Sequence, residues 1–192
     1  LFETMMGGLN QALENVKALE GYAVQDGTDF LETQLEDTIE KVLNNHQRQL
    51  QRVRVDTDFT FQKYIFKGNP LKLYDVFQNL VENSIEAMAK EDSPILKITT
   101  RVVEDRHITV IEDNGCGMSD EIRKHIFEPF YTTRELVKGR QRGLGLFNVW
   151  RLIEQHHGTV DLETREGEFT RMKVILPLDK GDNQVSNKAQ GD

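Results

Sequence analysis

The stretch that decides the fold is ILKITTRVVEDRHITVIEDNGCG, residues 95–117. Residues 95–103 and 107–111 are rich in β-branched residues that alternate with polar ones, the pattern of half-buried β-strands. Three polar residues, Glu104 to Arg106, separate the two runs, so the stretch predicts a β-hairpin. Its second strand runs directly into a polar loop that contains two glycines. The hairpin therefore indicates antiparallel pairing at the centre of a sheet, with a loop suited to ligand binding at one end.

Outside the hairpin, apolar residues recur at helical spacing in several segments. These predicted helices cover residues 9–21, a segment from about residue 31 with a possible cap at Asp29, residues 70–89, a short turn after Ser119 and residues 144–157. Short apolar runs predict further strands at residues 53–55, 59–65, 159–164 and 169–176. Because neighbouring strands are often joined as hairpins, the order favours an α+β fold over a doubly wound parallel sheet. We predict a two-layer α/β sandwich with a mixed, mostly antiparallel sheet and helices on one face, preceded by a helix.

The domain layout follows from these segments. Residues 1–26 are expected to form the end of a helix and a linker, and residues 27–179 a single domain. Residues 180–192 are polar and without periodicity, so we expect a disordered tail. The chain lacks an initiator Met, which suggests a piece of a longer protein.

Composition excludes several classes of function. The 192 residues carry a net charge of −8, which disfavours binding to nucleic acid or to anionic membranes. No apolar run is long enough for a transmembrane helix, and the first residues do not resemble a signal peptide. The single cysteine, Cys116, fits a reducing compartment and is interpreted as a small turn residue. We expect a cytoplasmic location for this part of a parent protein that could itself be membrane-anchored.

Asn79 and Asn83 lie four residues apart in the predicted helix, so their side chains share one face. Solvent exposure is the ordinary state of such amides. Asp113, at the end of the central strand, is followed by Gly115 and Gly117. This segment fits a simple turn, and it also fits a buried carboxylate that accepts a hydrogen bond from a nucleotide base.

A second glycine pair opens the last predicted helix. Gly143, Leu144, Gly145 and Leu146 follow a loop that contains Arg140 and Arg142. Free N–H groups at a helix start bind phosphate, and glycine permits close approach. A flexible loop with solvated charges is the alternative for this segment.

Four ordered segments together resemble the boxes of the catalytic ATP-binding domain of sensor histidine kinases, within the Bergerat-fold ATPase superfamily. They are Asn79-Leu-Val-Glu-Asn83 (N box), Asp113-x-Gly-x-Gly117 (G1 box), Phe127-x-Pro-Phe130 (F box) and Gly143-Leu-Gly145 (G2 box). The runs NSIEAM at residues 83–88 and EPFYTT at residues 128–133 most resemble the nitrogen-regulator type. The resemblance covers residues 29–178.

The resemblance implies the following roles. Asn83 binds Mg²⁺, Asn79 supports the phosphate end, and Asp113 accepts from the exocyclic amine of adenine. The other implied nucleotide-binding residues are Gly115, Gly117, Phe130, Thr132, Arg140, Arg142, Gly143, Leu144, Gly145 and Leu146. Residues 132–142 correspond to a mobile ATP lid. The implied reaction transfers the γ-phosphoryl group of ATP to a histidine, for relay to an aspartate on a response regulator.

The sequence departs from the family pattern at two points. Gln141 stands where the lid usually has a glycine, which puts the phosphate contacts of the lid in doubt. No histidine of the chain is followed by an acidic residue, so we expect the phospho-acceptor histidine outside this chain. By resemblance, the first helix is the end of a dimerisation helix, and the intact protein is expected to be a homodimer. We interpret Trp150 as a core residue.

Three alternatives remain beside the kinase. A Bergerat-fold ATPase clamp normally carries a glutamate that activates water at the start of the N box, where this chain has Asn79. The N-terminal helix disfavours an anti-sigma-type serine kinase. Gln141 is the one feature that favours a degenerate ATP-binding interaction module.

Overall fold

The computed structural model describes residues 30–60, 64–132 and 143–178. The predicted N-terminal helix, the predicted ATP lid apart from Thr132, which includes Arg140 and Arg142, and the predicted tail lie outside these ranges. Along the described chain the elements are β1 (Leu31–Thr33), α2 (Leu35–Asn45), the 3₁₀ helix η1 (Gln49–Arg52), β2 (Arg54–Asp58), β3 (Phe66–Gly68), α3 (Pro70–Ala87), β4 (Ile95–Val103), β5 (Arg106–Asp113), α4 (Asp120–His125), α5 (Gly145–Gln155), β6 (Thr159–Arg165) and β7 (Phe169–Pro177).

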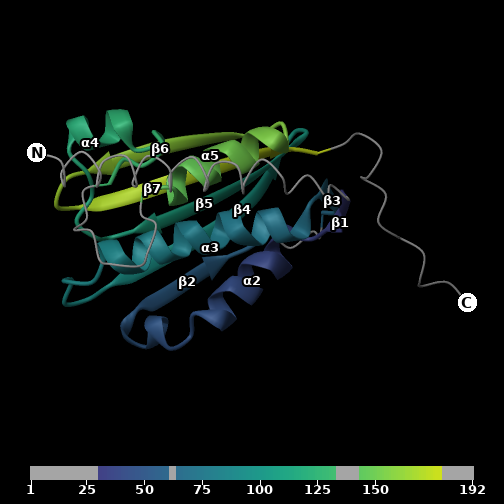
Figure 1. The fold of residues 1–192 in the computed structure, drawn as a ribbon. Coiled ribbons are helices and arrows are strands. Elements are labelled where there is room, and N and C mark those ends of the chain that lie inside the picture. The colour runs from purple at the N-terminus through teal and green to yellow at the C-terminus, as the bar shows by residue number, and fades with distance from the viewer. Residues whose placement is uncertain (1–29, 61–63, 133–142, 179–192) are drawn as a thin grey trace, which may run out of the picture.

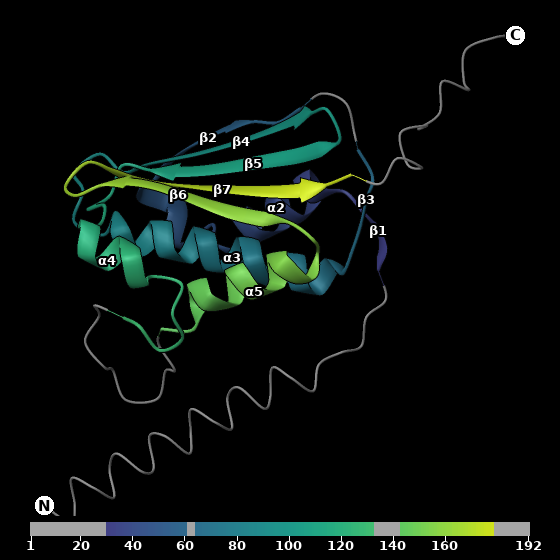
Figure 2. The ribbon, with the colours of Figure 1, turned by 90° about the horizontal axis from the view of Figure 1, so that it is seen from above.

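A five-stranded sheet forms one layer of the molecule, in the order β2-β4-β5-β7-β6 (Figure 1). β2 runs parallel to β4, and the remaining neighbours pair antiparallel. Helices α2, α3 and α5 cover one face of this sheet (Figure 2). The structure therefore confirms the predicted two-layer sandwich, including the hairpin of β4 and β5 that the sequence placed at residues 95–113.

The core lies between the sheet and the three helices. Alternate residues of the central strands point inward, so Ile98, Ile111 and Met172 stand side by side across β4, β5 and β7. The middle of α3 covers them with Phe77 and Leu80, both fully buried. Burying one such side chain contributes about 1.5–3 kcal/mol, so this layer fixes α3 firmly over the end of β5.

Helix α3 has a well-defined start. The side chain of Asn69 accepts hydrogen bonds from the N–H groups of Leu71 and Lys72 at 3.1 and 3.0 Å, and Pro70 occupies the first turn. Both features favour helix initiation at this point. The predicted span of residues 70–89 is thus confirmed to within two residues, because α3 ends at Ala87.

His156 ties the end of α5 to the start of α3. Its Nε2 accepts a hydrogen bond from the Asn69 N–H at 3.0 Å, and its Nδ1 donates to the Leu152 carbonyl at 2.7 Å. These two partners require the neutral ring, and burial also lowers the pKa of His156. The rings of Phe30 and Phe66 lie against it, with centroids 5.1 and 6.0 Å away.

Three sequence predictions of structure are wrong in detail. The helix expected from residue 31 begins at Leu35, because residues 31–33 pair with β3 as the strand β1. No strand spans residues 59–60, which follow the end of β2 at Asp58. Trp150 is not a core residue: its side chain is 41% exposed, because α5 buries the face formed by Val149, Leu152 and Ile153. Among the described residues, no helix is long and apolar enough to cross a membrane.

Candidate functional site

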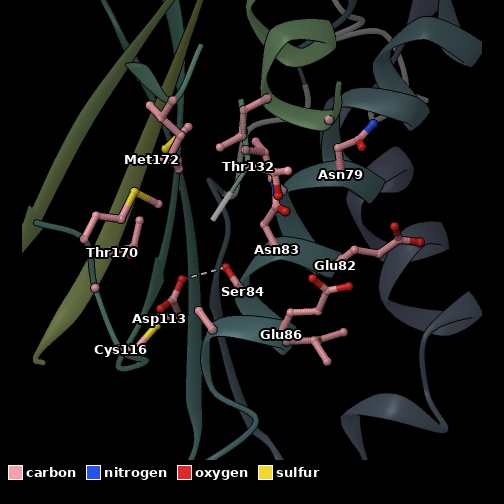
Figure 3. A pocket seen from close by; sticks show the side chains of 18 of the residues that line it. Asn79, Glu82, Asn83, Ser84, Glu86, Asp113, Cys116, Thr132, Thr170 and Met172 are labelled. Atoms are coloured by element: carbon pink, nitrogen blue, oxygen red, sulfur yellow. Dashed lines mark hydrogen bonds between the residues drawn. The ribbon is translucent and has the colours of Figure 1, made fainter. Parts of the chain in front are cut away.

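A pocket of about 1200 Å³ opens beside α3, where β5 ends and α5 begins (Figure 3). Its wall comes from α3, the loop after β5, α4 and its following turn, the start of α5, and β7. Eight predicted site residues line it: Asn79, Asn83, Asp113, Gly117, Thr132, Gly143, Gly145 and Leu146. The structure therefore brings segments that are far apart in the sequence to one cavity.

Asn79 and Asn83 face the pocket from successive turns of α3. The Asn79 amide donates to the Asp75 carbonyl at 2.7 Å, which orients its Oδ1 toward the start of α5. A Cβ atom at Gly145 would lie 2.9 Å from that oxygen and 4.0 Å from the Asn83 amide nitrogen. Glycine at position 145 therefore keeps the space between the two amides and α5 open.

Asp113 is the buried acid of the pocket, 3% exposed at the end of β5. Its Oδ2 accepts from the Ser84 hydroxyl at 2.9 Å, and its Oδ1 accepts from the Gly115 N–H at 3.0 Å. Burial raises the pKa of Asp113 to about 6, while the bonds from Ser84, Gly115 and the Thr170 backbone oppose the increase. The carboxylate is thus held in place and keeps its charge at neutral pH.

The two glycines after Asp113 allow the loop to pack closely. A Cβ atom at Gly115 would lie 2.6 Å from the backbone carbonyl carbon of Ala87, and the next residue, Cys116, donates its N–H to the Ala87 oxygen at 3.1 Å. Gly117 has φ +59°, and a Cβ atom there would lie 1.9 Å from the Arg165 oxygen. Gly117 lines the pocket, whereas Gly115 joins the loop to α3 behind it.

The opposite end of the pocket is formed by the junction that leads into α5. Gly143 has φ +83°, and its carbonyl accepts from the Phe130 N–H at 2.8 Å. Phe130 and Leu144 fall outside the lining; Leu144 is buried as the residue that precedes α5. An apolar side chain at this position cannot accept hydrogen bonds, so the first N–H groups of α5 are available to an anion.

Several residues that line the pocket were not predicted from the sequence. They are Ser84, Ile85, Cys116, Met118, Ile122, Ile126, Tyr131, Thr170 and Met172, among others. The sequence does contain one sign that Ser84 belongs to the site, because Ser84 directly follows Asn83 on the same helix. Thr170 and Met172 come from β7, and their proximity to Asp113 depends on the register of the β5–β7 pair.

The donor set of the pocket fits a nucleotide-bound magnesium ion. The described residues contain no cluster of three or more His, Cys, Asp or Glu side chains that could hold a metal by themselves. Mg²⁺ takes hard oxygen ligands and commonly keeps phosphate oxygens and waters in its shell. The amides of Asn79 and Asn83, beside the space that Gly145 leaves open, suit an ion that arrives with a phosphate chain.

The chain matches a known protein family. Residues 68–180 match the family described as histidine kinase-, DNA gyrase B- and HSP90-like ATPases. This range contains all four motif segments and most of the pocket wall.

Curated relatives include three bacterial kinases. Sporulation kinase E of Bacillus subtilis is 33% identical over 145 residues, which cover 75% of this chain and 19% of that protein. Sporulation kinase C of the same organism is 35% identical, over 59% of this chain and 25% of that protein. The signal transduction histidine-protein kinase AtoS of Escherichia coli is 33% identical, over 59% and 18% respectively. The chain therefore spans about a fifth to a quarter of these relatives.

Solved structures share the fold. The catalytic domain of the histidine kinase ThkA superposes with a TM-score of 0.68 at 24% identity, covering 78% of this chain and 95% of that domain. The full-length kinase ShkA, solved in complex with AMPPNP, gives a TM-score of 0.67 at 18% identity and covers 78% of this chain and 31% of that protein.

Proposed function

Since the chain belongs to the family of histidine kinase-, DNA gyrase B- and HSP90-like ATPases, we propose that it is the ATP-binding catalytic domain of a sensor histidine kinase. Its reaction would transfer the γ-phosphoryl group of ATP to a histidine outside this chain. The observation that carries the proposal is the convergence of Asn79, Asn83, Asp113 and Gly145 on one pocket. The curated relatives support the kinase activity, because their names describe two sporulation kinases and a signal transduction histidine-protein kinase.

Each end of the pocket has a distinct task in this proposal. Asp113 accepts a hydrogen bond from the adenine amine, and Met118 and Met172 supply apolar surface for the base. Asn83 binds Mg²⁺ through its amide oxygen, with Asn79 beside it on the phosphate side. Gly143 to Leu146 present the N–H groups of the α5 start to the phosphates, and the region of Thr132 to Arg142 acts as the lid.

The protein's contribution to phosphoryl transfer is mainly positioning, because the transferred group needs little covalent help. Anchoring the base at Asp113 and the phosphates at α5 fixes the direction in which the γ-phosphate points. Mg²⁺, when bound, neutralises charge on the phosphate oxygens. Asn79 cannot act as a general base, so the position at which an ATPase clamp carries its water-activating glutamate lacks that function here.

The domain layout, the partners and the subtype of the kinase are also part of the proposal. Residues 1–26 would be the end of a dimerisation helix and its linker, residues 27–179 the catalytic domain, and residues 180–192 a disordered tail. The parent protein would be a homodimer whose partners are a phospho-acceptor helix and a response regulator in the cytoplasm. The runs at residues 83–88 and 128–133 support the nitrogen-regulator type as the subtype of this kinase.

The test of the proposed function is nucleotide binding. We expect Mg-ADP to bind the wild-type chain with a dissociation constant in the micromolar to millimolar range, roughly −4 to −8 kcal/mol. Asp113→Ala removes the base acceptor and is expected to weaken binding of adenine nucleotides by about tenfold or more. Isothermal titration calorimetry measures both values. Equal affinity of the wild type and the variant would show that the base does not bind at Asp113.

A further inference from the structure

Ser84 lies immediately after the metal-site residue Asn83 on α3, yet it points to a different partner. Its hydroxyl donates to Oδ2 of Asp113 at 2.9 Å, across the gap between α3 and β5 (Figure 3). Both side chains are almost fully buried, at 5% exposed for Ser84 and 3% for Asp113. A helical serine often donates a hydrogen bond to a carbonyl of its own helix instead. The hydrogen bond from Ser84 in the helical layer to Asp113 in the sheet therefore needs an explanation.

The hydrogen-bonding capacity of Asp113 limits what a ligand can offer it. An ionised carboxylate has about four acceptor positions. Two hydrogen bonds from the protein use part of this capacity, one from the Ser84 hydroxyl and one from the Gly115 N–H. The remaining capacity is open to a ligand, and it accepts an amine but repels a carbonyl oxygen. Ser84 is the side-chain donor of the two, so it is the one that substitution can remove.

Resting on the adenine-nucleotide binding proposed above, we propose that Ser84 is a positioning and specificity-determining residue. Its hydroxyl fixes the Asp113 carboxylate so that the open acceptor position receives the 6-amino group of a purine and rejects a 6-oxo group. Without this bond, the carboxylate can rotate and present other lone pairs, and the distinction between the two groups weakens.

The position of Ser84 also links the two ends of the nucleotide. Asn83 and Ser84 are adjacent residues of one rigid helix, so the proposed metal ligand and the group that holds the base acceptor move together. The helix therefore holds the base-binding group at a fixed distance and orientation from the phosphate site.

Electrostatics supports the same role. Burial raises the pKa of Asp113, and the Ser84 hydrogen bond is the largest of the contributions that lower it. Removing the hydroxyl should therefore shift the ionisation of Asp113 to higher pH, and with it the pH range in which the charged acceptor is available.

The experiment compares Ser84→Ala with the wild-type chain by titration calorimetry, using Mg-ADP and Mg-inosine diphosphate between pH 5 and 8. Inosine carries a 6-oxo group where adenosine has the amine. Ser84→Thr retains the hydroxyl. Thr38→Ala is the matched control, because Thr38 is another buried helical hydroxyl, 5% exposed, that donates to the Gln34 carbonyl in α2.

We expect Ser84→Ala to weaken ADP about tenfold at pH 7, with inosine diphosphate changed less than about twofold. The midpoint of the pH dependence of ADP binding should move to higher pH. Ser84→Thr and Thr38→Ala should keep the wild-type preference and midpoint.

Different results overturn different claims. If Ser84→Ala keeps both the preference and the pH midpoint, or weakens both nucleotides equally, Ser84 has no role in specificity and the proposed function stands. A wild-type chain that binds neither nucleotide overturns both proposals.

Discussion

Asp113 is both buried and ionised, and this combination lowers the stability of the folded protein. The Asp113 pKa of about 6 lies well above the ordinary value of 3.8. Each pKa unit corresponds to about 1.4 kcal/mol, so the ionised carboxylate destabilises the ligand-free fold by about 3 kcal/mol at neutral pH. A ligand that donates a hydrogen bond to the carboxylate recovers part of this free energy.

This cost predicts a pH dependence of stability. Between pH 3.8 and about 6 the folded state holds a proton on Asp113 that the unfolded state has released. The contribution of Asp113 to the free energy of unfolding therefore falls as pH rises through this range and is constant above it. Urea unfolding of the wild type and of Asp113→Asn, measured at several pH values, isolates the effect as a difference. A difference that does not vary with pH would show that Asp113 titrates normally.

Gly117 and Gly167 allow a controlled comparison of two glycine-to-alanine substitutions. Both have positive φ, +59° and +76°, but a Cβ atom at Gly117 meets the Arg165 oxygen at 1.9 Å, whereas a Cβ atom at Gly167 meets nothing within 4 Å. Gly167→Ala should cost about 1–2 kcal/mol from backbone strain alone. Gly117→Ala adds a clash with backbone and should cost at least about 2 kcal/mol more, together with a loss of ADP affinity. Thermal unfolding and titration of both variants test this, and equal costs would contradict it.

At the scale of elements, the attachment of α5 to α3 depends on His156. Its neutral ring accepts from Asn69, the residue that caps α3, and packs between Phe30 and Phe66. Substitution by alanine leaves a cavity and removes the hydrogen bond to the Asn69 N–H, so we expect His156→Ala to lower the free energy of unfolding by about 2–4 kcal/mol.

The same histidine predicts a loss of stability in acid. Burial lowers the pKa of His156 below its ordinary value of 6.5, so the unfolded state takes up a proton first as pH falls. The His156 contribution is complete above pH 6.5 and decreases below it. His157→Asn is the control, since His157 is exposed with φ 57°, which asparagine tolerates. Urea unfolding of the wild type, His156→Ala and His157→Asn at several pH values on both sides of 6.5 measures this. The prediction is wrong if the stability difference between the wild type and His156→Ala does not shrink below pH 6.5.

Local patterns in the sequence predicted elements better than they predicted contacts. The β4–β5 hairpin and the start of α3 at Pro70 depend on neighbouring residues, and both are confirmed. Residues 31–33 were taken for helix because their pairing with β3 is a tertiary contact that overrides local preference. Trp150 was assigned to the core because hydrophobicity does not show which face of α5 packs against the sheet.

The same limit applies to the site. Asn79, Asn83 and Asp113 were found because motif spacing marks them, and the structure places all three on one cavity. The hydrogen bond from Ser84 to Asp113 was not predicted, since it depends on how α3 lies over β5. Residues of β7 were missed for the same reason: strand register across long separations leaves no local signal.

For the whole molecule, the proposed function predicts that the γ-phosphoryl group is transferred to a separate acceptor helix and not to the chain's own histidines. With γ-labelled Mg-ATP the chain should not phosphorylate its own histidines, but it should slowly label an acceptor helix that is supplied separately. The rate is expected to be low because no tether raises the effective concentration of the acceptor. Autoradiography with an acid-stability assay measures the product.

An Asn83→Ala chain is the control for that experiment. It should lose transfer and retain much of its affinity for the adenine base, because the proposed base and metal sites lie at separate ends of the pocket. Acid-labile phosphate on His46, His107, His125, His156 or His157 would contradict the prediction. Rapid release of free phosphate without any acceptor would instead indicate an ATPase clamp.

The pairing of β5 with β7 has a consequence for how the protein is made. Asp113 lies opposite Thr170 in this pair, so the base acceptor gains its last backbone donor from a strand near the end of the described chain. A ribosome releases the N-terminal part first, and that nascent part holds Asn79, Asn83 and Asp113 without the strand that completes their pocket. Under the proposed function, we therefore expect nucleotide binding to begin only once β7 has been synthesised and has joined the sheet.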